Sequence, residues 1–263
     1  MFAEKFIESR FKHLGAEELG IRGFSDQLKN CDREKFNRMH SNTTVFALKF
    51  KNGVLIAGDR RMSDGFLGIV SDDTLKVKEL AKYSAMACAG FCNIISFLET
   101  NMTTACSTFK SLYGQDLSPD GQANFLRNLL EPWWFMSVYT WYWAVGIPIL
   151  ATYDMSLGMP RIFVFDDSGF NYEPEFFGGA GCGFEAIRGL VVDHWRLDMN
   201  EDFALMIAMK AMLHSGAISH GVSDARLKLP TMAVINEDGF RWIPDELLKK
   251  ALGLILERTE GLK

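Results

Sequence analysis

A threonine, an aspartate and a lysine follow one another in an order that could support hydrolysis. The run SNTTVFALKFKNGVLIAGDRRMS, residues 41–63, holds Thr43 near its start and Asp59 near its end, and Lys76 follows in TLKVK. A threonine hydroxyl is a weak nucleophile until a base takes its proton, and the α-amine of a threonine at a chain start can be that base. A nearby lysine would lower the pKa of the amine, and an aspartate would hold the lysine. The three residue types therefore fit a threonine nucleophile.

The elements around these residues would bring the first two together. The apolar runs TTVFALKF and GVLIAGD are separated by Asn52-Gly53, a dipeptide typical of tight hairpins. Folding the chain back at this turn places Thr43 opposite the segment 59–61. We therefore expect a hairpin that carries a hydroxyl and a charged cluster at its open end.

The next two runs would add a cation and a backbone amide. In TLKVK, Lys76 lies between Leu75 and Val77, so its side chain points to the opposite face of the strand. Gly90 lies near the end of the run YSAMACAGF, just before a helical pattern begins. Its N–H group could stabilise a developing oxyanion.

An ordinary structural explanation exists for each of these residues. A threonine often begins a strand, the Asp-Arg-Arg sequence at 59–61 is typical of a surface ion cluster, and Lys76 could be a solvated strand residue. The spacing by itself leaves both interpretations open.

The composition is that of a soluble globular protein. The 263 residues are 48% hydrophobic and carry a net charge of −5, which argues against a nucleic-acid-binding surface. The start of the chain mixes acidic and basic residues and lacks the apolar stretch of a secretory signal. The cysteines are odd in number and scattered, which indicates reduced thiols: Cys31, Cys88, Cys92, Cys106 and Cys182.

One uncharged segment, residues 132–153, is long enough to cross a bilayer. It contains Pro132, Gly146 and Pro148, and its aromatic residues are spread throughout instead of forming two belts. Buried strands explain the segment better, so no membrane contact is expected.

The remaining patterns alternate between strands and helices. Strands are expected at 43–50, 53–59, 74–78 and 83–91, with hairpins at 161–173, turning at 167–169, and at 231–243. Helices are expected at 92–113, around 121–130, and at 184–197, 200–216 and 244–260. Asn200 would cap the fourth helix, and Pro244 would stand in the first turn of the last. Sheets packed together with helices outside both would satisfy this order.

Several of these motifs together resemble a proteasome β subunit, most closely the bacterial, actinobacterial type. They are TTVFALKF with GVLIAGDRR, LKVKEL, AMACAGF, GGAGCGFEAI and LPTMAVINEDGF, and the resemblance extends over residues 43–263. It implies an α+β fold, the four-layer αββα sandwich of N-terminal nucleophile hydrolases. It also implies that residues 1–42 are a propeptide, removed autocatalytically between Asn42 and Thr43.

The resemblance implies a function as well. Residues 43–263 would be a threonine endopeptidase domain with Thr43, Asp59 and Lys76 as catalytic residues, Gly90 at the oxyanion, and no metal or cofactor. The partners implied are proteasome α subunits and other β subunits in stacked rings, a ring ATPase activator and unfolded protein substrates, in the cytoplasm. Neither nucleic acid nor membrane is implied.

Around the catalytic trio the chain departs from the family pattern. The residue before the nucleophile is Asn42 instead of glycine, and Ala180 replaces a serine that contacts the threonine amine. Ser219 and Val222 fall where an aspartate and a hydroxyl residue are expected, and Asp224 is a candidate displaced substitute. The residues expected to support the trio are Arg61, Ala180, Gly181, Ser219 and Asp224. Those expected by position to contact substrate are Met62, Ser63, Thr74, Lys78, Cys88 and Cys92.

Two other functions remain open at this stage. The departures at Asn42, Ala180 and Ser219 are compatible with a β-like subunit that assembles but is inactive or unprocessed. The chain could also be another N-terminal nucleophile hydrolase, an amidase that acts on a small molecule.

Overall fold

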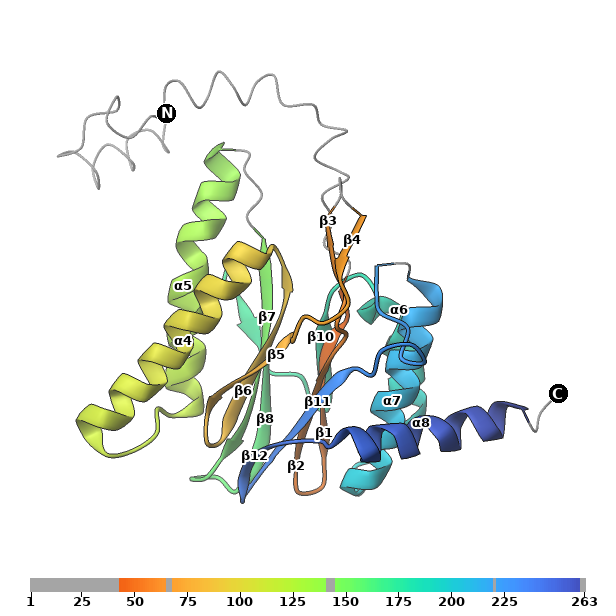
Figure 1. Cartoon of the computed structure of the whole chain (residues 1–263). Coiled ribbons are helices and arrows are strands. Elements are labelled where there is room, and N and C mark those ends of the chain that lie inside the picture. The colour runs from red at the N-terminus through yellow and green to blue at the C-terminus, as the bar shows by residue number, and fades with distance from the viewer. Residues whose placement is uncertain (1–42, 65–67, 141–144, 220, 261–263) are drawn as a thin grey trace.

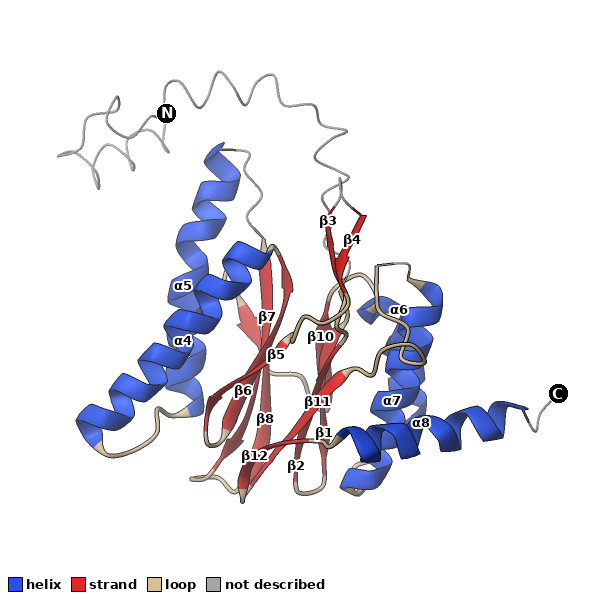
Figure 2. Cartoon of the chain, viewed as in Figure 1, coloured by secondary structure: helices blue, strands red, loops and turns tan. Residues whose placement is uncertain are grey.

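Two five-stranded sheets face each other, with helices on both outer faces (Figures 1 and 2). The computed structural model describes residues 43–64, 68–140, 145–219 and 221–260. Sheet I has the strand order β10 (Phe177–Ala180), β1 (Val45–Phe50), β2 (Gly53–Gly58), β11 (Thr231–Asn236), β12 (Gly239–Trp242). Sheet II has the order β5 (Val77–Ala81), β6 (Ser84–Gly90), β7 (Gly146–Asp154), β8 (Met159–Phe165), β9 (Asn171–Tyr172). Neighbouring strands in both sheets are antiparallel.

The helices divide between the two outer layers. Helices α4 (Cys92–Tyr113) and α5 (Pro119–Thr140) cover sheet II, whereas α6 (Phe184–His194), α7 (Glu201–Ile218) and α8 (Asp245–Glu260) cover sheet I (Figure 1). The layers therefore run helix, sheet, sheet, helix. This is the expected four-layer α+β sandwich, and the order of strands and helices along the chain is the one that the sequence predicts.

Strand alternation explains how three hydrophobic layers form from these elements. In β1, Val45 and Ala47 face sheet II, while Phe46 and Leu48 pack under α6 and α7. Successive side chains of a strand point to opposite faces, so a strand buried on both faces must be apolar throughout. A third cluster, which includes the fully buried Leu98, fills the space between sheet II and helices α4 and α5.

The β1–β2 hairpin forms as predicted, with its turn one residue earlier than expected. Phe50 pairs with Gly53, so Lys51 and Asn52 make the two-residue turn, and Gly53 is the first residue of β2. A side chain at Gly53 would meet the Ile235 carbonyl oxygen at 2.6 Å, and this close approach requires glycine there.

Two helix predictions are confirmed in detail. The helix expected at 92–113 is α4 with the same bounds. Asn200 caps α7, because its side-chain oxygen accepts a hydrogen bond from the Phe203 N–H at 2.9 Å.

The prediction of strands throughout residues 132–153 is wrong. Helix α5 continues to Thr140, and strand β7 starts only at Gly146. Pro132 lies inside the helix, where it removes one backbone hydrogen bond. Packing outweighs that loss, because Trp133 packs against the buried cluster beside α4 and meets Phe97 edge-on at 5.4 Å. No helix within the described ranges is long and apolar enough to span a membrane.

Three shorter elements also differ from the prediction. The strand expected at 74–78 begins at Val77, and a small hairpin, β3 (Met62–Asp64) with β4 (Gly68–Ser71), precedes it. Strand β10 has the sequence FGGA, whose glycines carry no strand signal.

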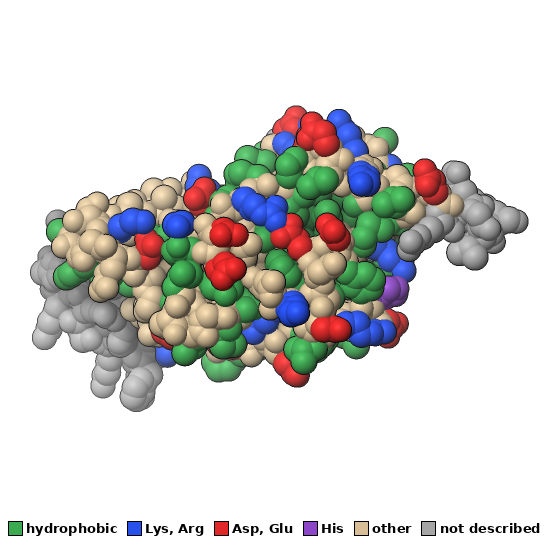
Figure 3. All heavy atoms as spheres, turned by 90° about the horizontal axis from the view of Figure 1, so that it is seen from below, with side chains coloured by type: hydrophobic (Ala, Val, Ile, Leu, Met, Phe, Trp, Pro, Cys, Tyr) green, Lys and Arg blue, Asp and Glu red, His purple; other side chains and the backbone are tan. Residues whose placement is uncertain are grey.

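The face of the molecule seen in Figure 3 carries acidic and basic side chains among hydrophobic ones.

Candidate active site

The threonine, the aspartate and the lysine lie in direct contact at one end of the facing sheets. The Lys76 Nζ donates hydrogen bonds to Thr43 Oγ1 at 3.0 Å and to Asp59 Oδ1 at 2.7 Å. The exposed fractions of Thr43, Asp59 and Lys76 are 3%, 0% and 6%. A buried ammonium therefore connects a carboxylate to a hydroxyl group.

The open end of the β1–β2 hairpin positions the first two residues. Val45 pairs with Gly58, so Thr44 and Asp59 follow as the next opposed pair. The Asp59 N–H donates to the Thr44 carbonyl at 3.0 Å, and the Thr44 N–H donates to Asp59 Oδ1 at 2.9 Å. Thr43 is the residue just beyond this pair, and its place follows from the hairpin register.

The Asp59 carboxylate is held from several directions. Besides Lys76 and the Thr44 amide, the N–H of Arg61 donates to Asp59 Oδ2 at 2.9 Å and the N–H of Ser223 at 3.3 Å. Hydrogen bonds to a carboxylate are stronger than neutral ones. This fixes Asp59 and, through it, the lysine.

The electrostatics of Lys76 follow from its burial. Burial lowers the pKa of the Lys76 ammonium below the ordinary lysine value, and the adjacent Asp59 opposes that shift. The Lys76 side chain also lies against Gly58, where an added Cβ would meet the Lys76 Cβ at 3.1 Å. A poorly solvated cation at 3.0 Å from a hydroxyl group stabilises the deprotonated form of that hydroxyl.

The glycine-rich segment after β10 encloses the main chain of Thr43. Gly181 has a φ of 96°, and a Cβ there would lie 2.1 Å from the Thr43 carbonyl oxygen. The Gly183 N–H donates to that same oxygen at 3.3 Å. Glycine is required at 181 by both backbone conformation and close approach.

Gly90 ends β6 at the same end of sheet II as Lys76. Val77, the first residue of β5, pairs with Ala87. Because the strands are antiparallel, Gly90 lies beyond the start of β5, the end at which Lys76 stands. Its φ is 137°, and a Cβ there would lie 2.1 Å from the Val145 carbonyl oxygen. This backbone is open to glycine alone.

The residues expected to support the trio differ in what they contact. Arg61 contributes its N–H to Asp59, and its guanidinium pairs with Asp72 at 2.7 Å. Ala180 pairs with Val45 and packs between the sheets. Ser219 follows α7 as its C-terminal cap, and its hydroxyl lies 3.4 Å from the Cys182 thiol.

Asp224 is not brought to the trio by its side-chain hydrogen bonds. Its carboxylate binds the Arg226 guanidinium at 2.6 Å, and this contact keeps the pKa of Asp224 below its usual value. Val222 is buried and apolar.

The residues expected to contact substrate differ in their exposure to solvent. Met62, Ser63 and Thr74 are half-buried in or beside the β3–β4 hairpin, while Lys78 and Cys92 are exposed. Cys88 lies instead in the hydrophobic cluster beneath α4, and burial raises the pKa of its thiol. Its side chain is therefore not available at a surface.

Three polar residues at the site were not anticipated from the sequence. Thr44 and Ser215 form a buried hydroxyl pair at 2.5 Å. Ser223, one position past Val222, donates its N–H to Asp59 and accepts the Arg60 N–H at 3.0 Å through its hydroxyl. A one-residue shift in the loop after α7 would have identified Ser223, whereas no local pattern identifies Ser215.

The described part of the chain contains no group of three or more histidine, cysteine, aspartate or glutamate residues arranged to hold a metal ion. The polar groups around Thr43 Oγ1 and Asp59 include the Lys76 ammonium, backbone amides and the hydroxyl groups of Thr44, Ser215 and Ser223. Such a set can activate a nucleophile and stabilise charge on oxygen.

The layers and the family match together show an α+β sandwich of the N-terminal nucleophile hydrolase type. The chain belongs to the proteasome subunit family, because the family model "Proteasome subunit" matches residues 39–223.

Curated relatives agree with this family. The chain is 28% identical over 226 residues to proteasome subunit beta 2 of Thermomonospora curvata, covering 83% of this chain and 79% of the relative. It is 29% identical over 219 residues to proteasome subunit beta of Streptomyces griseus, covering 82% and 76%. It is 27% identical over 221 residues to proteasome subunit beta of Frankia casuarinae, covering 82% of this chain and 79% of the relative. The predicted resemblance to actinobacterial β subunits is confirmed.

Proposed function

We propose that this chain is a threonine endopeptidase subunit of a proteasome-like barrel, with Thr43 as its nucleophile. The observation that carries the proposal is the chain of contacts from Thr43 Oγ1 to Lys76 Nζ to Asp59, at 3.0 and 2.7 Å and out of solvent. The family membership supports a peptidase of the proteasome type.

The first reaction is the removal of residues 1–42. The Thr43 oxygen attacks the carbonyl carbon of Asn42, the C–N bond to Thr43 breaks, and the nitrogen takes the proton to become an amine. Water then hydrolyses the resulting ester, which releases the Asn42 carboxylate and restores the hydroxyl. The product is a chain that starts with a free α-amine at Thr43.

Turnover repeats this chemistry on a substrate. The α-amine takes the Thr43 hydroxyl proton as the oxygen attacks a peptide carbonyl, and Lys76 stabilises the negative charge. The proton passes to the leaving amine, and an acyl-enzyme remains. Water activated by the α-amine then releases the second product. The Gly90 N–H stabilises the oxyanion in both steps.

The assembly follows from the same proposal. Rings of β subunits would stack between rings of α subunits, and a ring ATPase would feed unfolded chains into the chamber, in the cytoplasm. Substrate would bind in an extended form along Ser63, with Met62, Thr74, Lys78 and Cys92 near its side chains.

The test is co-expression of the full-length chain with its cognate α subunit. Intact mass should show a mature chain that begins at Thr43, and the purified complex should hydrolyse an unfolded protein such as casein. Both results should be lost in Thr43→Ala. Processing and hydrolysis that persist in Thr43→Ala would refute Thr43 as the nucleophile, and hydrolysis of small amides alone would indicate an amidase.

A second candidate is an assembled but inactive subunit. Three observations favour it: Asn42 precedes Thr43, Ala180 packs between the sheets without a hydroxyl group, and Ser219 contacts Cys182. Full-length chain that persists in assembled rings would establish this alternative.

A further inference from the structure

We infer that Ser215 and Thr44 form a positioning pair that holds the nucleophile at its distance from Lys76. The inference rests on the proposed function, because it assigns residues that act through Thr43. It concerns a contact between β1 and α7, 171 positions apart in the sequence.

The two hydroxyl groups form a directed chain of hydrogen bonds. The Ser215 hydroxyl donates to the Gly183 carbonyl at 3.3 Å and lies 2.5 Å from the Thr44 hydroxyl. A serine hydroxyl has one proton to donate. Since that proton goes to Gly183, Thr44 must donate to Ser215. The order is Thr44 to Ser215 to Gly183.

These hydrogen bonds complete a ring of contacts around Thr43. On one side, the Thr44 N–H binds Asp59, which holds Lys76. On the other side, the Gly183 N–H binds the Thr43 carbonyl oxygen. The hydroxyl pair connects the two sides, so the main chain on both sides of the Thr43 carbonyl carbon is tied to a fixed framework.

The surroundings of Ser215 argue that the hydroxyl is kept for this contact. The other buried residues of α7 are Ala204, Leu205, Ile207, Ala208, Met209, Ala211 and Met212. Ser215 is thus the polar member of an otherwise apolar buried face. Burying a hydroxyl group costs free energy unless it is hydrogen-bonded, and core packing alone would be served by alanine.

Gly183 provides a second way to disturb the pair. Its backbone, with φ −81° and ψ −12°, is open to any residue, so a side chain there is limited by space alone. A Cβ at 183 would lie 2.0 Å from Thr44 Oγ1 and 2.2 Å from Ser215 Oγ. Gly189, in α6, has nothing within 4 Å of the same added atom. Gly183→Ala and Gly189→Ala are therefore a matched pair.

The experiment compares five variants of the full-length chain assembled with its α subunit. Thr44→Val and Ser215→Ala remove the hydroxyl groups, Gly183→Ala separates them, and Thr44→Ser and Gly189→Ala are the controls. Hydrolysis of a fluorogenic peptide is measured per mature site, counted by intact mass, alongside the rate of cleavage before Thr43.

We expect kcat and the cleavage rate to fall about 10- to 100-fold in the first three variants, because a shift of about 1 Å at a reacting group costs that much. KM should stay within about twofold, since the pair does not contact substrate. Gly189→Ala should behave like the parent, and Thr44→Ser should keep more of the activity than Thr44→Val. Thr44→Ser restores the hydroxyl group and distinguishes positioning from simple packing.

The outcomes separate the two proposals. A parent protein that neither processes nor hydrolyses overturns the proposed function and this inference with it. An active parent, with Thr44→Val, Ser215→Ala and Gly183→Ala equal to it, overturns the inference alone. The inference is also overturned if the hydrolysis rates of all variants correlate with their unfolding temperatures and Thr44→Ser is no more active than Thr44→Val.

Discussion

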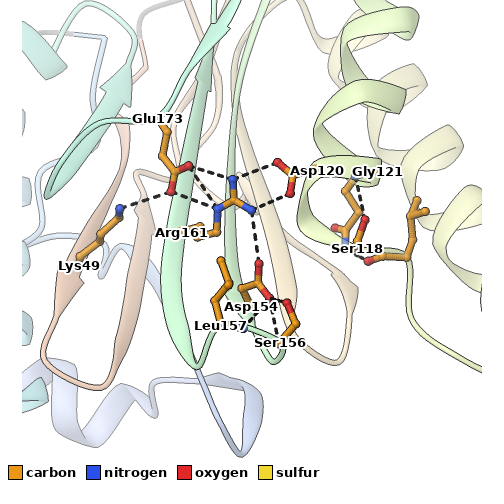
Figure 4. A network of polar contacts seen from close by, with 11 residues as sticks. Lys49, Ser118, Asp120, Gly121, Asp154, Ser156, Leu157, Arg161 and Glu173 are labelled. Carbon is orange, nitrogen blue, oxygen red and sulfur yellow. Dashed lines mark hydrogen bonds and ion pairs between the residues drawn. The ribbon is translucent and has the colours of Figure 1, made fainter.

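Two clusters of charged residues connect separate parts of the sandwich, and they are built in opposite ways. At the candidate active site, Lys76 is paired with one carboxylate, that of Asp59, and both are buried. In the second cluster, Arg161 is surrounded by the carboxylates of Asp120, Asp154 and Glu173 (Figure 4). We call this second group the Arg161 cluster.

The Arg161 cluster joins four elements and both sheets. Arg161 on β8 binds Asp120 of α5 at 2.8 Å, Asp154 of β7 at 3.3 Å and Glu173 at 3.0 Å. Glu173 also lies 3.7 Å from the ammonium of Lys49 on β1, in sheet I (Figure 4). Several of these groups reach solvent, and the Asp120 side chain is 65% exposed.

The two environments move the pKa of the cation in opposite directions. Burial lowers the pKa of Lys76, because one carboxylate does not replace the lost hydration. Hydrogen bonds with Asp120 and Glu173 raise the pKa of Arg161. The first cluster therefore holds a buried cation whose pKa is lowered, as the proposed function requires, whereas the second connects elements of the fold through a cation whose pKa is raised.

The largest difference is expected when each cation is replaced by methionine. Lys76→Met should reduce peptide hydrolysis about a thousandfold or more, because the charge that stabilises the alkoxide is lost. Arg161→Met should leave hydrolysis per folded subunit within about twofold. Both rates are measured with a fluorogenic peptide on assembled complexes, and intact mass counts the mature chains, because the same chemistry would remove residues 1–42.

A Lys76→Met complex that keeps its activity would contradict the role of the ammonium. Equal losses of activity in both variants would show that the two clusters are not functionally distinct. Circular dichroism of each purified variant establishes that the comparison is made between folded proteins.

The sequence predicts one half of the active site better than the other, for a physical reason. A two-residue turn sets the register of a hairpin, so local residues place Thr43 near the segment 59–61, although the turn lies one residue earlier than predicted and opposes Thr44 to Asp59. Lys76, one residue before β5, is assigned from its place in TLKVK and from the family resemblance, because its contacts with Thr43 and Asp59 join the two sheets. Only the contacts within the hairpin depend on short-range geometry.

The remaining contacts depend on long-range packing. Ser215 reaches Thr44 because α7 lies across sheet I, and no pattern near either residue encodes that crossing. The helix through Pro132 forms because buried neighbours outweigh a poor local preference. Strand β10 is similar, since its glycines are selected by close approach to Phe184 and Val164 and not by strand propensity.

The pH dependence of hydrolysis sharpens the comparison. If the reaction requires the protonated Lys76, the rate falls on the alkaline side as Lys76 loses its proton, at a pH below that of an ordinary lysine. Asp59 raises the pKa of Lys76, so Asp59→Asn should move this alkaline limb to still lower pH. The profile of kcat/KM against pH measures the shift.

The control for this shift is Asp120→Asn, which removes a carboxylate from the Arg161 cluster. Its alkaline limb should coincide with that of the parent. A limb that moves to higher pH in Asp59→Asn would contradict the assignment to Lys76.

The Arg161 cluster should contribute to the stability of the fold. Arg161→Met leaves three carboxylates near one another without their shared partner, and the free energy of unfolding should fall by about 2 kcal/mol. The value is below that of a fully buried pair because the carboxylates are partly hydrated. Urea unfolding of the unassembled chain measures it, with exposed Arg188→Met on α6 as the control.

The smallest effect is expected from Asp120, and its sign follows from its pKa. The hydrogen bonds from Arg161 lower the pKa of Asp120 in the folded chain, so the unfolded chain binds more protons in the window between the two values. The stabilisation is present above the ordinary aspartate value, about pH 4, and is lost as the pH falls through the lower, folded value. In Asp120→Asn the unfolding free energy should therefore decline less steeply below about pH 4.

Because Asp120 is largely exposed, the difference at neutral pH should be no more than about 1 kcal/mol. Asp193→Asn, at an exposed position of α6 outside the cluster, is the matched control and should follow the parent. Thermal unfolding in a series of buffers from neutral to acid pH gives both curves. A steeper acid decline in Asp120→Asn than in the parent would contradict a stabilising role of this carboxylate in the Arg161 cluster.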